Sequence, residues 1–399
     1  MRHHEFVVPG AVFALLSAVA PLGAQAACPR PAPRQFADGD VVTIRDGRPP
    51  CRIQLVETPI VLRTDAAGLI ADIGATVYRA PDGKFVTYTS RGELSIWTAD
   101  GRFLKNIGRE GRGPGEFAIG PVSVHFDRTG AVFARDNNQR WTRLTPAFEY
   151  LNNASAAGME YSIERAAMLD DGMYLSGGVS RNGAHYFNVY DPQKQGDAAA
   201  ASGPPIVRSF GDVPTAERAL PPTSRERLVA YSGGTTFWAG PPRAAGRGYE
   251  LELWSTDGRL LRTIRRVAAW FPKGADRQPP RASEGTATRE PTQLSLVASD
   301  TTGLLLVAVF RTNESWKPVP VSDREAYIAN RNASGEIRIE VIDTRSGTLL
   351  VSSEPMTRAQ LEEQFMSGII RGTSLGYKRG FTADDMRMVR MVEWKLVRQ

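Results

Sequence analysis

Short runs of alternating apolar and polar residues, broken by Asp-Gly pairs, recur along most of this chain. The clearest is Leu94–Phe117, LSIWTADGRFLKNIGREGRGPGEF, in which two strand-like segments flank Asp100-Gly101 and a glycine-rich stretch follows. Asp-Gly between alternating segments is a strong hairpin signal, because the turn needs positive φ angles that glycine adopts without strain. The pattern predicts antiparallel β-hairpins.

The same hairpin returns further along the chain. Leu94–Ile107 and Leu251–Ile264 share leucine, tryptophan, Asp-Gly, arginine, leucine and isoleucine in register. Weaker copies turn near Pro146, Asp191 and Asp343. These second-hairpin turns, at 100, 146, 191, 257 and 343, are separated by 46, 45, 66 and 86 residues. A period near 45 residues with insertions accounts for them.

A first hairpin precedes each of these. The first-hairpin turns are Pro81-Asp82-Gly83, Asp127–Gly130, Asp170–Gly172, Gly233-Gly234 and Asp300–Gly303. Two consecutive hairpins make a four-stranded unit, which gives five units between Ala75 and Ser353. A short helix with a capping box at Thr357 and three further strands follow.

The fourth strand of the last unit can come from Arg52–Leu62. Closing a ring with both chain ends would leave no exposed sheet edge between first and last units. The sequence thus predicts an all-β fold: a six-bladed β-propeller of four-stranded antiparallel blades, the last blade closed by N- and C-terminal strands. The proline- and glycine-rich insertions 195–205, 214–227, 272–292 and 313–334 are expected to be surface loops.

The first residues predict export. Residues 1–26 combine a basic start, an apolar run from Phe6 to Leu22 and Ala24-Gln25-Ala26, which is typical of a cleaved signal peptide. We expect a periplasmic or secreted protein without a transmembrane segment after cleavage, the alternative being an uncleaved anchor. Residues 27–51 would form an N-terminal extension, and residues 52–399 the propeller. A lipoprotein is disfavoured, since no leucine stands three residues before Cys28.

Two cysteines, Cys28 and Cys51, both lie in this extension. In an oxidising compartment they are expected to form one disulfide, the alternative being two free thiols.

The formal charge is +6 and the sequence pI about 9.4. A basic surface attracts anionic partners. The arginines are scattered, however, and no basic run interleaves with aromatic residues, so a nucleic-acid partner is not expected.

The segment 107–117, IGREGRGPGEF, resembles the blade ends of bacterial six-bladed propellers related to NHL repeats. The resemblance is close over Gly74–Trp141 and weaker elsewhere. It implies a six-bladed propeller in a secreted or cell-envelope protein, and it carries no assigned activity.

Candidate chemistry is sparse. The glycine-rich loop lacks the lysine and hydroxyl of a phosphate loop and is followed by a strand, so it reads as a blade-linking turn with Phe117 wedged between blades. Arg109 and Arg112 could still hold an anion. His125 lies on the predicted inner strand Val122–Phe126 and could face the channel, the alternative being a structural histidine with its hydrogen bonds satisfied. Asp136, Asn137 and Asn138 end a strand where calcium ligands could sit, although such residues usually form turns.

Zinc chemistry is not expected, because only His125 and His185 remain after the leader. The four recurring tryptophans, Trp97, Trp141, Trp254 and Trp394, read as core between blades, with sugar stacking as the alternative.

No catalytic residues, metal ligands or cofactor are therefore predicted. The expected function is an exported binding module for a protein, peptide or anionic glycan partner, acting as a monomer. The alternative is a calcium-assisted hydrolase or lactonase with its site at the channel mouth.

Overall fold

The computed structural model describes residues 26–63, 76–88, 92–118, 121–156, 164–178, 184–194, 204–218, 225–242, 248–271, 286–287, 292–317, 319–320, 323–381 and 387–399. The signal-peptide prediction for residues 1–26 lies almost entirely outside these ranges. No helix within them is long and apolar enough to cross a membrane.

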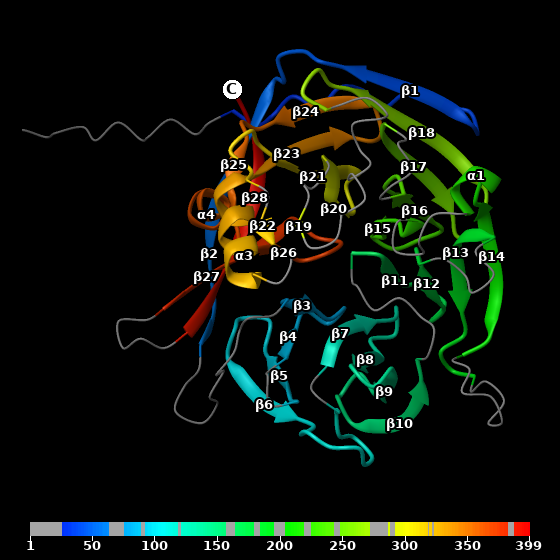
Figure 1. The fold of residues 1–399 in the computed structure, drawn as a ribbon. Helices are drawn as coiled ribbons and strands as arrows, with labels where there is room; N and C mark the ends of the chain where they lie inside the picture. The colour runs from blue at the N-terminus through cyan, green and yellow to red at the C-terminus, as the bar shows by residue number, and fades with distance from the viewer. Residues whose placement is uncertain are drawn as a thin grey trace, which may run out of the picture.

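Six sheets, each built on four antiparallel strands, stand in a ring around a central channel (Figure 1), which confirms the predicted six-bladed β-propeller. Each blade runs from an innermost to an outermost strand. Blade 1 contains β3 (Tyr78–Arg79), β4 (Phe85–Tyr88), β5 (Leu94–Trp97) and β6 (Phe103–Ile107). Blade 2 contains β7 (Pro121–Phe126), β8 (Val132–Asp136), β9 (Arg140–Leu144) and β10 (Tyr150–Ser155). Blade 3 contains β11 (Ala166–Met168), β12 (Tyr174–Ser176), β13 (His185–Tyr190) and β14 (Ile206–Asp212).

The remaining three blades complete the ring. Blade 4 contains β15 (Val229–Ala230), β16 (Thr236–Ala239), β17 (Tyr249–Ser255) and β18 (Leu260–Val267). Blade 5 contains β20 (Gln293–Ser299), β21 (Leu304–Thr312), β23 (Gly335–Asp343) and β24 (Thr348–Ser352), with β25 (Met356–Thr357) beside β23. Blade 6 contains β26 (Gly368–Ile369), β27 (Leu375–Phe381), β28 (Arg387–Arg398) and β2 (Cys51–Arg63).

Blade 6 joins the two ends of the chain, as the sequence predicted. The early strand β2 is antiparallel to the last strand β28, from Cys51 opposite Arg398 to Arg63 opposite Met388, with an irregularity between Glu57 and Val61. This pairing closes the ring through hydrogen bonds between strands more than 300 residues apart.

Neighbouring blades are held together by apolar side chains between them. Phe117, 1% exposed, packs with side chains of blade 1 and of blade 2 in one cluster, so it lies between those blades as expected. Trp97, Trp141 and Trp394 are buried in comparable clusters, and Trp254 is partly buried between blades 3 and 4.

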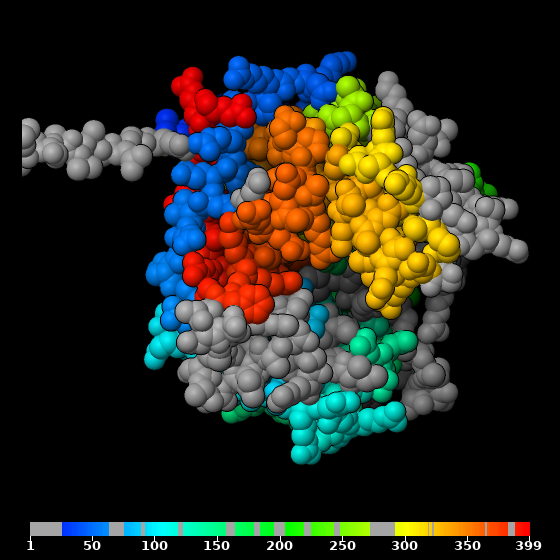
Figure 2. Space-filling model, turned by 60° about the vertical axis from the view of Figure 1, so that its left-hand side comes forward, coloured from blue at the N-terminus to red at the C-terminus, as the bar shows by residue number. Residues whose placement is uncertain are grey.

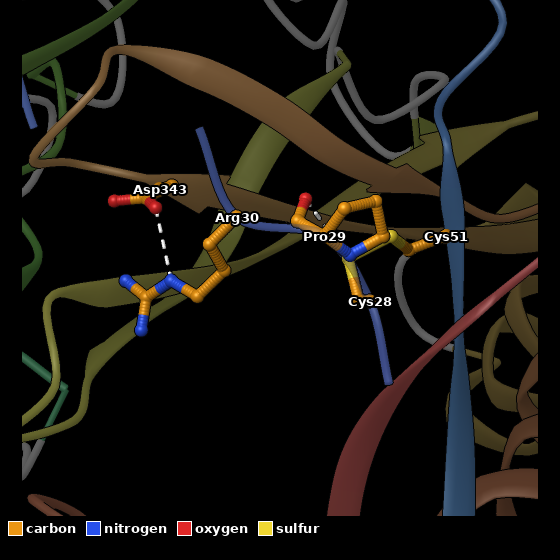
Figure 3. Close-up of a disulfide and its surroundings, with 5 residues drawn as sticks. All are labelled: Cys28, Pro29, Arg30, Cys51 and Asp343. Atoms are coloured by element: carbon orange, nitrogen blue, oxygen red, sulfur yellow. Dashed lines mark hydrogen bonds and ion pairs between the residues drawn. A yellow bond between two sulfur atoms is a disulfide. The ribbon is translucent and has the colours of Figure 1, made fainter. Parts of the chain in front are cut away.

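Residues 26–50, here called the strap, cross the outside of three blades. The disulfide between Cys28 and Cys51, with a Cα–Cα distance of 5.6 Å, attaches the strap to blade 6 and confirms the predicted pairing (Figure 3). Arg30 Nε donates to Asp343 Oδ2 of blade 5 at 2.9 Å (Figure 3). The strap then continues to blade 4, where β1 (Asp40–Arg45) adds a fifth, parallel strand to β18. Sequence patterning did not predict this strand.

The insertion 313–334 is not simply a loop. It contains β22 (Val319–Pro320), which pairs with β19 (Thr286–Ala287), and helix α3 (Arg324–Ser334), whose N-cap Asp323 accepts from the Ala326 N–H. Helix α3 lies on the surface near β25 (Figure 2). The predicted capping box at Thr357 is present at α4 (Arg358–Gln360), which runs into a π-helical turn, η2 (Leu361–Phe365).

The insertion 214–227, which follows β14, contains a four-residue helix, α1 (Thr215–Arg218).

Candidate functional site: the channel mouth

The first-hairpin turns of all blades lie on one face of the ring, because the innermost strands run in the same direction. On this face a cavity of about 590 Å³ opens into the central channel, here called the channel mouth. Residues from all six blades line it. They are Thr76–Pro81, Val124–Arg128, Ala167, Met168, Asp170, Tyr231–Gly233, Thr301 and Ile369–Thr373.

Three arginines and two aspartates give the channel mouth its charge. Arg79 and Arg128 are exposed at the rim. Both carboxylates already accept hydrogen bonds from the turns: Asp127 Oδ1 from the Thr129 and Ala131 N–H groups, and Asp170 Oδ2 from the Gly234 N–H. The mouth therefore carries a surplus of positive charge, and its carboxylates are engaged in stabilising the turns.

Arg371 is the third arginine, and it reaches across the channel. It lies in the turn between β26 and β27 of blade 6, and its Nη1 donates to the Ala166 carbonyl of blade 3 at 2.9 Å. Blades 6 and 3 stand opposite one another in the ring (Figure 1). Ala166 begins β11, so it lies deeper than Met168, and the guanidinium points from the mouth into the channel. Its Nη2 is enclosed and has no hydrogen-bond partner among the described residues.

His125 lies on β7 beside this arginine's cavity and is 8% exposed. Its ring meets Trp141 and Tyr174 edge to face, with centroid separations of 5.8 and 5.2 Å. Its Nε2 is also enclosed without a hydrogen-bond partner in the described part of the chain. Burial, followed by the positive charges of Arg371 and Arg135, lowers the pKa of His125 to about 3. The imidazole is therefore neutral at physiological pH.

The other candidate residues lie on the opposite face of the ring from the mouth. Asp136, which pairs with Pro121 at the start of β7, is 1% exposed. Its Oδ1 accepts from the Asn138 and Arg140 N–H groups, and its Oδ2 from the Ala118 N–H and Arg140 Nε. This carboxylate thus organises the turn that also contains Asn137.

Arg140 also fixes the glycine-rich loop that carries Arg109 and Arg112. Its Nη1 donates to the Arg112 carbonyl at 2.8 Å, and its Nη2 donates to the carbonyls of Gly111 and Glu116. Arg109 pairs with Glu116. The structure therefore gathers these five candidates around the blade-linking loop and separates them from His125.

No metal site stands out where the structure is described. There, no group of three or more His, Cys, Asp or Glu side chains is placed to hold a metal ion. Calcium binding stays a prediction of the sequence alone.

Sequence reasoning named His125 but missed Arg79, Arg128 and Arg371. Each lies in or within two residues of a first-hairpin turn. Comparing the residues at equivalent turn positions of all six units would have found them, because those positions converge at one face of a ring.

No protein family and no curated protein matches this chain. Solved structures do. A "putative exported protein" from Bacteroides fragilis matches with a TM-score of 0.56 and 13% identity, covering 90% of this chain and 100% of the other. The likeness shows the fold alone.

Two weaker matches are a protein of unknown function from Bacteroides caccae and the β-propeller domain of Cps50 (Swd1) from Myceliophteria thermophila. Their TM-scores are 0.34 and 0.38, and their identities 15% and 10%. They cover 70% and 86% of this chain, and 82% and 99% of their own. No NHL-family relationship emerges from these matches.

Proposed function

We propose that this protein is an exported binding protein that holds an anionic partner at the channel mouth without transforming it. The observation that carries the proposal is that Arg79, Arg128 and Arg371 line the mouth. The carboxylates of Asp127 and Asp170 also lie there, but they already accept hydrogen bonds from N–H groups of the turns. Cationic clefts with low-dielectric walls concentrate anions and accelerate their association.

Export is supported by two observations. The Cys28–Cys51 disulfide fits an oxidising compartment, and one structural neighbour is described as exported. A partner for this site would therefore be found in the cell envelope or outside the cell, among peptides or acidic glycans.

The proposal is tested with the double variant Arg79→Gln/Arg128→Gln on arrays of acidic and neutral glycans and peptides. We expect the wild-type protein to favour acidic ligands and the variant to lose at least about tenfold in affinity, more at low than at high salt. The matched control is Arg102→Gln/Arg358→Gln, which removes the same charge at exposed sites outside the mouth. Equal losses in both variants, or a preference for neutral ligands, would contradict the proposal.

Thermal melting with calcium and with EDTA addresses the hydrolase alternative. A binding protein that needs no calcium should melt at the same midpoint in both.

A further inference from the structure

Two enclosed nitrogen atoms without hydrogen-bond partners among the described residues belong to side chains of residues that line the same cavity. They are Nη2 of Arg371 and Nε2 of His125, and they come from blades 6 and 2. Buried polar atoms are paired in the great majority of folded proteins, because leaving one unpaired forfeits the hydrogen bond it made to water. Two such unpaired nitrogen atoms at one cavity therefore indicate a hydrogen-bonding group that a bound ligand supplies.

The chemistry of the two side chains restricts that group. A guanidinium only donates, so the group must offer an acceptor to Nη2. A neutral imidazole donates through one nitrogen and accepts through the other, so Nε2–H can serve as the second donor. Both side chains thus suit an oxygen atom, and the positive charge of Arg371 favours a negatively charged one.

The residues around these two nitrogen atoms restrict the charge that a ligand group can carry. The cavity walls near these atoms include Val77, Val124 and Ile370, which solvate charge poorly. The carboxylate of Glu164 already places one negative charge near Arg371, so each further negative charge on a ligand is less well compensated. A monoanionic carboxylate therefore fits better than a phosphate dianion.

We propose that the channel below the mouth is a carboxylate-binding subsite, in which Arg371 Nη2 and His125 Nε2 together donate to the acid group of the ligand. This inference rests on the proposed function and makes it more specific: the ligand is a small molecule or a chain end with a free carboxylate. Arg79 and Arg128 stay at the rim and contact whatever part remains outside.

Histidine NMR on the full chain tests the subsite directly. The chain has four histidines, and the variant His125→Gln identifies the His125 signal. The probes are galacturonate with its methyl ester, N-acetylalanine with its amide, and inorganic phosphate. We expect one or both carboxylates to shift the ¹⁵N signal of His125 and leave that of His185 in place. The ester, amide and phosphate should shift neither signal.

Comparing galacturonate with N-acetylalanine also distinguishes the two chemical classes of ligand. A response to galacturonate alone indicates an acidic sugar, and a response to N-acetylalanine alone indicates a peptide-like ligand. If neither carboxylate moves the His125 signal, or if the ester, amide or phosphate moves it equally, the subsite does not exist as proposed.

The variant Arg371→Gln should weaken carboxylate binding at least about tenfold, because the charged donor is lost. Arg371→Lys keeps the charge and serves as the second variant should the glutamine protein fold poorly, and it should bind more tightly than the glutamine variant. Unchanged affinity in both overturns the inference.

Failure of this inference is distinguishable from failure of the proposed function. Should Arg79→Gln/Arg128→Gln weaken binding to acidic ligands while Arg371→Gln does not, the mouth binds anions and the deeper subsite is wrong. Should neither variant weaken it, both are wrong.

Discussion

A residue in the channel interior meets conditions unlike those of any surface residue. His125 is enclosed by Trp141 and Tyr174 and faces the charges of Arg371 and Arg135. Each of these effects disfavours the imidazolium form. Because the imidazole resists protonation only in the folded protein, the free energy of unfolding should decrease at acidic pH.

The variant His125→Gln should make stability less dependent on pH. The folded-state pKa of His125 is lowered from 6.5 to about 3, so below pH 6.5 the unfolded chain binds a proton that the folded protein does not. Stability is full above pH 6.5 and falls by up to about 1.4 kcal/mol per pH unit as pH decreases toward 3. Urea unfolding at pH 7.0, 5.5 and 4.5 should show this slope in the wild-type protein and a flatter one in the variant.

The control is His185→Gln, whose side chain is 31% exposed and lies outside the channel. It should keep the slope that His125 produces. A wild-type slope in His125→Gln would show that the histidine is protonated in the folded state.

At the scale of elements, the blade-linking loop shows how an irregular segment is stabilised. Residues 108–117 form no ladder with neighbouring strands apart from a bridge between Glu110 and Phe117, so their carbonyls need other partners. Arg140 supplies three of these bonds and also pairs with Asp136, whose side chain is fully buried. One side chain therefore holds the connection between blades 1 and 2.

The variant Arg140→Ala should lower the free energy of unfolding by about 3 kcal/mol, because the buried Asp136 carboxylate loses its charged partner and keeps only backbone donors, while three carbonyls lose their side-chain donor. Chemical denaturation measures this. Arg140→Lys should recover only part of the loss, since a single ammonium cannot reach all four acceptors. The exposed pair Arg102–Asp100 offers the contrast: Arg102→Ala should lower the free energy of unfolding far less than Arg140→Ala does.

The elements that a local turn motif marks could be predicted from the sequence. The elements without such a motif could not. The hairpins of blades 1 to 5 carry Asp-Gly or related turns, and the glycines at these turns have positive φ angles, 89° at both Gly83 and Gly101. Strand β1 pairs in parallel with residues more than 200 positions away, and no nearby turn marks such a pairing. Helix α3, which begins after its N-cap Asp323, lies inside an insertion whose overall composition is typical of a loop.

The channel mouth is formed by residues far apart in the sequence, so no local sequence pattern predicts it. Arg79 and Arg371 are almost 300 residues apart, and only closure of the ring brings them to the same mouth. The sequence predicts His125 on an inner strand, but two of the residues that surround it, Tyr174 and Arg371, come from other blades. Sequence reasoning therefore reached the fold and one channel residue, and the basic mouth became visible only in three dimensions.

At the scale of the whole molecule, the strap and blade 6 close the ring. The strap joins blade 6 through the disulfide, blade 5 through Arg30, and blade 4 through β1. Arg266 extends this connection. It pairs with Glu340 of blade 5 at 3.1 Å and with Asp46 just after β1 at 2.6 Å. Blades 4, 5 and 6 are thus linked along their outer edges as well as through their apolar contacts.

The variant Cys28→Ser/Cys51→Ser should lower the free energy of unfolding by roughly 3 kcal/mol, the loop-entropy value for cysteines 23 residues apart. The melting temperature should fall, and a reducing agent should lower that of the wild-type protein but leave the variant unchanged. Equal stability of variant and wild type would mean that the strap's other contacts already hold it in place.

The pairing of β2 with β28 sets the order in which the molecule can be completed. The early strand β2 has its partner in β28, more than 300 residues further along, so a nascent chain holds an unpaired edge until β28 emerges. The ring, and with it the basic mouth, can therefore form only once β28 is available to pair with β2.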